Sequence, residues 1–207
     1  MPRWEPDGAE RLETAAFDLF AEQGFDRTTV AEVAERAGLT PRTFFNHFAD
    51  KREVLFGLSA EFRQRVVRGI AECPAAVPPL DAAVHALQGA LDTMFEHRRA
   101  AVARRFAIVE ATPELREREL GKNADLADAV EAALRARGHD PDTARFAADA
   151  ASAVQRRAMQ EWTGTADGPP LRELVVAGLH ALRAAVAGGA DAARPDTAAE
   201  RGPTAAR

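Results

Sequence analysis

A short segment, residues 40–48, carries the side chains with the clearest capacity for specific chemistry. On a helix with 100° between successive residues, Phe44 falls on one face, while Arg42 and Asn46 fall on the opposite face. Arg can form a bidentate pair with guanine and Asn with adenine, and Thr43 can meet a base edge or a thymine methyl group. We therefore interpret the outer face of this segment as a surface that could read bases in the DNA major groove.

Other polar residues flank this segment at positions that suit phosphates. The amino end of the preceding helix offers free N–H groups and the positive end of a dipole, which favour an anion. Between Gly38 and Arg52, three basic residues accompany one acidic residue, so this stretch is locally positive. The alternative is that these are ordinary solvated residues at helix ends. The predicted DNA-contacting residues are Arg27, Thr28, Thr29, Thr40, Pro41, Arg42, Thr43, Phe45, Asn46, His47 and Lys51.

The sequence offers little for enzymatic chemistry. Its histidines show no HExxH or ExxH spacing, and it contains no GxxxxGK[ST] or GxGxxG loop. Neither Ser59 nor Ser152 lies in a nucleophile elbow. A lone cysteine, Cys73, excludes an intrachain disulfide. We predict that the protein is not an enzyme and has no catalytic residue, metal or cofactor.

Start and stop residues indicate which helices position these side chains. Thr29 with Glu32 forms a capping box, Gly38 suits the end of that helix, and Thr40 suits the start of the next. Asp50 is expected to cap a fourth helix. The sequence predicts nine helices, at about 11–23, 30–37, 41–48, 51–72, 80–96, 97–111, 113–137, 142–163 and 171–187.

Composition favours an all-α, two-domain protein, because helix formers dominate and tyrosine is absent. The net charge of −5 does not favour nucleic acid. No signal peptide or membrane span is evident, so a cytoplasmic location is expected. Prolines within residues 74–79 mark the best candidate boundary between domains. The predicted units are a flexible arm (1–9), a three-helix DNA-binding head (10–52, connected by a fourth helix to about 72), a helical body (73–187) and a disordered tail (188–207).

Residues 20–25, 28–40 and 43–51 resemble the amino-terminal domain of tetracycline-repressor-type (TetR family) regulators, without gaps over about residues 10–60. The resemblance implies an all-helical homodimer that binds a near-palindromic operator and a small molecule in its carboxy-terminal domain. It also implies that Thr28 or Thr29, Arg42, Thr43, Phe45, His47 and Lys51 occupy DNA-contacting positions. The family often has Tyr where this chain has Phe45, which cannot donate a hydrogen bond to a phosphate. A repressor is the first expectation, with an activator or an interaction protein that lost operator binding as alternatives.

The body resembles the family only in the number and length of its helices. Apolar residues on the last two long helices could pair with a symmetry mate in a four-helix bundle, or they could line the chain's own core. That stripe comprises Phe146, Ala150, Ala153, Val154, Leu174, Val175, Leu179, Leu182 and Val186.

Met and aromatic residues in the body suit an adaptable ligand cavity, although each one alone is more often core. The predicted ligand-binding residues are Met94, Phe95, His97, Arg104, Phe106, Met159 and Trp162. The arginines of residues 98–105 and of 156–157 are expected to form solvated helix faces.

Overall fold

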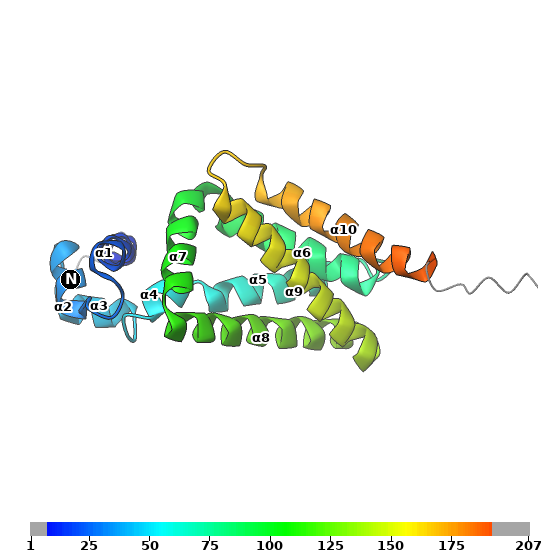
Figure 1. Ribbon diagram of the computed structural model, residues 1–207. Helices are drawn as coiled ribbons and strands as arrows, with labels where there is room; N and C mark the ends of the chain where they lie inside the picture. The colour runs from blue at the N-terminus through cyan, green and yellow to red at the C-terminus, as the bar shows by residue number, and fades with distance from the viewer. Residues whose placement is uncertain (1–7, 192–207) are drawn as a thin grey trace, which may run out of the picture.

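The computed structural model describes residues 8–191, and all regular structure in that range is helical (Figure 1). This confirms the all-α prediction, and most predicted helix ends agree with the structure to within about two residues. The described helices are α1 (Gly8–Gln23), α2 (Val30–Arg36), α3 (Pro41–His47), α4 (Glu53–Phe56), α5 (Ser59–Glu72), α6 (Pro79–Met94), a 3₁₀ turn η1 (Glu96–Arg98), α7 (Arg99–Ala111), α8 (Pro113–Ala136), α9 (Pro141–Gly164) and α10 (Leu171–Asp191).

The molecule has a small head and a larger body, each with its own hydrophobic core. The head consists of α1 to α4, and its core centres on Leu12, Phe20 and Phe44. The body consists of α5, α6 and α8 to α10, with Trp162 among its fully buried side chains. Helix α7 stands upright between the two in Figure 1, and its Ile108 and Val109 belong to the head core.

The predicted fourth helix is interrupted at Gly57, which separates α4 from α5. Phe56 is buried in the head core, whereas Phe62 is buried in the body core. One continuous apolar stripe in the sequence therefore serves two cores. The boundary between them falls near Gly57, not at the proline-rich stretch 74–79. On the carboxy-terminal side of Gly57, α5 packs closely against α6. If Gly69 carried a Cβ atom, that atom would lie only 3.0 Å from the Cβ of Ala86.

Two predicted termini need correction where the structure describes them. Helix α1 already includes Gly8, the first described residue, instead of starting near residue 11, because Ala9 and Glu10 are compatible with a helix. Helix α10 runs on to Asp191, since no proline interrupts residues 188–191. The rest of the predicted arm and tail, residues 1–7 and 192–207, lies outside the described residues.

Within residues 8–191, none of the helices combines the length and apolar character that a membrane crossing requires. The same residues contain no group of three or more His, Cys, Asp or Glu side chains placed to hold a metal ion.

Candidate DNA interface and ligand cavity

The turn between α2 and α3 is fixed at both ends by caps. The Thr29 hydroxyl accepts a hydrogen bond from the Glu32 backbone N–H, and the Glu32 carboxylate accepts one from the Thr29 backbone N–H (2.8 Å). At the other side, the Thr40 hydroxyl accepts from the Thr43 N–H (3.1 Å). Gly38 has a φ of 65°, a conformation that disfavours any residue with a Cβ. Both predicted caps are confirmed, and together they fix the turn between α2 and α3.

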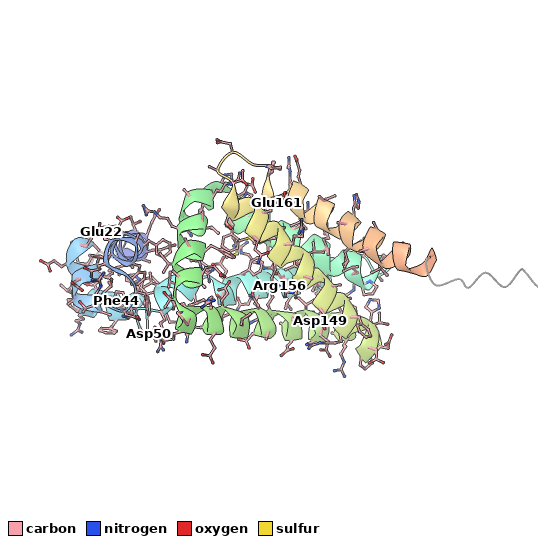
Figure 2. The ribbon with its side chains drawn as sticks, viewed as in Figure 1. Glu22, Phe44, Asp50, Asp149, Arg156 and Glu161 are labelled. Atoms are coloured by element: carbon pink, nitrogen blue, oxygen red, sulfur yellow. The ribbon has the colours of Figure 1, made fainter. Side chains whose placement is uncertain are left out.

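Helix α3 divides into a buried and an exposed face, as the helical wheel predicts. Phe44 (labelled in Figure 2) is fully buried, and its ring lies beside the tilted ring of Phe48, with 5.5 Å between ring centroids. Phe45, one residue later, is 58% exposed. Arg42 and Asn46 are also exposed. Neither Arg42 nor Asn46 has a hydrogen bond or ion pair to any residue in the described range. The outer face of α3 therefore presents donors that remain available to a partner.

The predicted phosphate contacts at the start of α2 are not supported by this geometry. Thr28 is 1% exposed, and its hydroxyl donates to the Gly24 carbonyl (2.9 Å). Thr28 is therefore not a surface residue. Thr29 is exposed, but its hydroxyl donates to the Glu32 carboxylate (2.7 Å). Hydrogen bonds from Thr29 hold the pKa of Glu32 below its ordinary value, so a carboxylate already occupies the anion position there.

Lys51 serves as an internal clamp of the head in this structure. Its ammonium group donates to the carbonyl oxygens of Phe25 (2.8 Å), Asp26 (3.3 Å) and Thr28 (3.1 Å). It also lies 4.3 Å from the centroid of the Phe25 ring. Three acceptors match the three N–H donors of an ammonium group. A phosphate contact by Lys51 would therefore require one of these bonds to be exchanged.

The remaining predicted DNA contacts are at the surface or close to it. Arg27 is exposed, and its Nε donates to the Gln23 carbonyl (2.6 Å). The Thr40 and Thr43 hydroxyls bond to each other (2.9 Å), while Pro41 is exposed beside them. His47 is half-buried and lies near α1, where a Cβ on Gly8 would be 3.1 Å from its Nε2.

Sequence reasoning missed one residue that supports this turn. The Arg11 guanidinium donates to the Ala37 carbonyl at the end of α2. A Cβ on Gly38 would also lie 2.9 Å from the Arg11 Nη2. Arg11 and Ala37 lie on different helices, so no local pattern could reveal this contact.

A cavity of about 670 Å³ extends from the body to the junction with the head. Of the predicted ligand-binding residues, Phe95, Phe106 and Met159 line it. Met94, His97, Arg104 and Trp162 do not line this cavity. Trp162 is 1% exposed and packs in the body core under the Arg99 guanidinium, which lies 5.2 Å from its ring centroid.

Three of the four arginines at residues 98–105 contact the head, and Arg99 bonds to body carbonyls, which corrects the prediction of a solvated face. Arg98 forms an ion pair with Glu13 of α1 (2.8 Å). Arg104 pairs with Asp18 of the same helix (2.9 Å). These acids lie far earlier in the sequence, so their proximity arises only from the fold. Helix α7 thus connects the cavity to α1.

Helix α4 is held from two sides by further arginines. The Arg105 Nε donates to the Leu55 carbonyl (2.7 Å), and its guanidinium lies 5.0 Å from the Phe56 ring centroid. Arg118 of α8 lies 5.5 Å from the same ring and pairs with Glu53. Two guanidinium groups therefore lie within cation–π distance of Phe56, which stabilises this buried ring where head and body meet.

Comparison with known proteins agrees with this architecture. Residues 13–58 match the family described as "Bacterial regulatory proteins, tetR family". The chain is 29% identical over 200 residues to the HTH-type transcriptional regulator TcmR of Streptomyces glaucescens, covering 92% of this chain and 84% of the relative.

Two solved structures share the fold over nearly the whole chain. The first is FadR of Thermus thermophilus, a TetR-family transcriptional repressor in complex with lauroyl-CoA. It has a TM-score of 0.52 and 23% identity, and the match covers 94% of this chain and 100% of FadR. The second is a SmeT–triclosan complex, with a TM-score of 0.57 and 22% identity, covering 95% of this chain and 99% of SmeT.

Proposed function

Because residues 13–58 match the tetR family of bacterial regulatory proteins and the chain is 29% identical to TcmR over 200 residues, we propose that it is a TetR-family homodimeric repressor of a near-palindromic operator, released by a small molecule. In this proposal the head, up to about residue 57, binds DNA, and the body binds the ligand and the second subunit. A cytoplasmic location follows from access to DNA.

The observation that carries the proposal is the exposed face of α3. Arg42 and Asn46 are exposed and without protein partners in the described range, and they stand on the second helix of a helix-turn-helix. These side chains suit guanine and adenine edges, respectively. Phe45 supplies an exposed ring that can contact a sugar or a thymine methyl group, but it cannot donate to a phosphate.

Exposed apolar residues on α9 and α10 support dimerisation there. Phe146 is 74% exposed and Val186 is 72% exposed, so both side chains are accessible to a second subunit. Val154 and Leu179 of the predicted stripe are instead buried in the chain's own core. Val154 and Leu179 thus belong to the chain's own core, and we assign Phe146 and Val186 to the proposed dimer interface. A two-fold axis at α9 and α10 would place two α3 helices about 34–36 Å apart, one turn of DNA.

The cavity and α7 support control by a ligand. A volume of about 670 Å³ is typical of small-molecule sites. Helix α7 lines this cavity through Val102 and Phe106 and contacts α1 through Arg104. A ligand that favours a different position of α7 would shift the heads, provided that it binds the two states with different affinities. FadR with lauroyl-CoA and SmeT with triclosan are relatives whose structures hold such small molecules.

Selection from random duplex DNA tests the proposal. We expect the full-length protein to enrich a near-palindromic sequence with half-sites about one DNA turn apart. Arg42→Ala should enrich a site that has lost its base preference at one position in each half-site, whereas Arg68→Ala, an exposed arginine on α5, should enrich the wild-type site. Sedimentation should show a dimer at micromolar concentration. Failure of the wild-type protein to enrich any sequence, or a monomer in solution, would contradict the proposal. An activator would enrich the same DNA but raise transcription from it.

A further inference from the structure

The cavity has an apolar interior. Phe62, Leu91 and Leu126 are buried residues of the body core, and all three line it. Phe95 lies beside Phe62, with 5.6 Å between their ring centroids. Met159 of α9 adds a flexible thioether to the same lining. Such a surface favours a hydrophobic body, aromatic or aliphatic, in the ligand.

Most of the acidic side chains that line the cavity are already neutralised by arginines. Glu13 pairs with Arg98 (2.8 Å), and Glu119 pairs with Arg105. Glu53 pairs with Arg118 of α8. Glu110 is the remaining acidic residue of the lining, and it is exposed. The acidic groups therefore contribute little uncompensated negative charge.

Basic side chains of the lining are less well compensated. The side chains of Lys122 and Arg116 of α8 and of Arg156 of α9 form no hydrogen bond or ion pair with any residue in the described range; Lys122 is half-buried, and Arg116 and Arg156 are exposed. Arg63 of α5 reaches Asp125 only at 4.0 Å. Figure 2 shows Arg156 on α9, the helix that crosses the body beside α8. The cavity therefore carries excess positive charge contributed by three helices.

We propose that the effector is an amphiphilic organic anion, whose hydrophobic body lies against Phe62 and Phe95 and whose acidic group is bound by Arg156 and Lys122. This rests on the proposed ligand-binding function of the cavity. Charge-assisted hydrogen bonds beside an apolar wall are stronger than those in open solvent. An uncharged ligand of the same shape would leave these cations without a partner.

Two fluorescent probes with the same aromatic body test the proposal. They are 1-anilinonaphthalene-8-sulfonate and its uncharged analogue N-phenyl-1-naphthylamine, each titrated into the full-length protein. The sulfonate should bind roughly tenfold more tightly than the neutral probe. Ala101→Trp, which fills the cavity from α7, should abolish binding of both probes. Binding that persists in this variant would show that the probes lie elsewhere and would overturn the proposal.

The neighbouring arginines of α9 provide a matched control. Both arginines are exposed, but Arg156 lines the cavity and Arg157 does not. Arg156→Gln and Lys122→Gln should each weaken sulfonate binding about five- to tenfold without changing that of the neutral probe, and Arg157→Gln should change neither. Equal binding of the two probes, or equal losses at Arg156 and Arg157, would overturn the anion preference while leaving a ligand cavity intact. If neither probe binds, the proposed ligand-binding function fails as well.

Discussion

The head and the body of this protein are stabilised in different ways. In the head, α2 and α3 are short helices held by specific polar contacts, such as the Thr29–Glu32 capping box and the three carbonyls that Lys51 binds. In the body, long alanine-rich helices pack mainly through apolar contacts and leave a cavity of about 670 Å³. Helices this short are unstable alone, so the head requires its clamps. The difference suits a rigid reading surface and an adaptable ligand domain.

Ion pairs and cation–π contacts join the head and the body, in addition to apolar packing. Arg98 and Arg104 contact α1, while Arg105 and Arg118 enclose Phe56 of α4. Since the same α7 helix lines the cavity, the junction can transmit a change in the adaptable region to the rigid one.

The largest expected effect separates two neighbouring phenylalanines of the head. Phe44→Ala removes a fully buried ring and should lower the free energy of unfolding by about 3–5 kcal/mol. Phe45→Ala truncates a ring that is 58% exposed, so it should change the free energy of unfolding by less than about 0.5 kcal/mol. It should nevertheless weaken operator binding. Urea denaturation with a DNA-binding assay measures both quantities. Equal stability losses in the two variants would contradict the assigned faces of α3.

Lys51→Met tests whether the clamp is structural. It keeps the length of the side chain but removes the bonds to three carbonyls, so we expect a loss of about 1.5–3 kcal/mol in the free energy of unfolding. Lys122→Met is the control, because Lys122 makes no such bond within the described residues. If Lys51→Met keeps full stability and only flattens the salt dependence of DNA binding, Lys51 is a phosphate contact instead.

At the junction, the Glu13–Arg98 pair should contribute modestly to stability and more visibly to coupling. Both side chains are partly exposed, so a double-mutant cycle with Glu13→Gln and Arg98→Gln should give about 0.2–1 kcal/mol. At a saturating ligand concentration, each variant should release DNA less completely than wild type. Glu61→Gln breaks the Glu61–Arg65 pair within α5 and serves as the control. If the ligand releases DNA from the junction variants as fully as from wild type, the Glu13–Arg98 pair does not couple the cavity to the head.

The smallest expected effect is a pH dependence at the start of α4. Burial raises the pKa of Asp50, but hydrogen bonds from Arg52 outweigh it and hold the pKa below its ordinary value of about 3.9. A lowered pKa in the folded state adds stability above the unfolded pKa, and that stability is lost as pH falls through the folded pKa. The stability difference between wild type and Asp50→Asn should therefore be present at neutral pH, begin to shrink only near the ordinary pKa of about 3.9, and disappear once the pH lies below the lowered pKa of the folded state. A difference that persists unchanged into acid would show that the Asp50 charge is not involved.

Local patterns predicted the head well, because its key contacts join residues close in sequence. The Thr29 and Thr40 caps and the inward direction of Phe44 all follow from spacing within one helix. The burial of Thr28 and the position of Lys51 do not follow from such spacing, because they depend on the loop at residues 24–28 folding back on the head.

The body was harder to predict, because its pairings join distant segments. Helical periodicity located α6 to α10, but it gave no sign that Arg98 and Arg104 would meet acids of α1. Periodicity also cannot show which apolar residues leave space between helices. Trp162 and Phe106 carry similar sequence signals, yet one fills the core and the other lines the cavity.

The central claim is that the exposed face of α3 reads base edges. The most direct test measures the affinity of wild type and Arg42→Ala for every single-base variant of the selected operator, at fixed salt concentration. The account predicts that Arg42→Ala loses about 1–3 kcal/mol of discrimination at one position in each half-site and keeps its preferences elsewhere. An unchanged specificity profile in Arg42→Ala would contradict it.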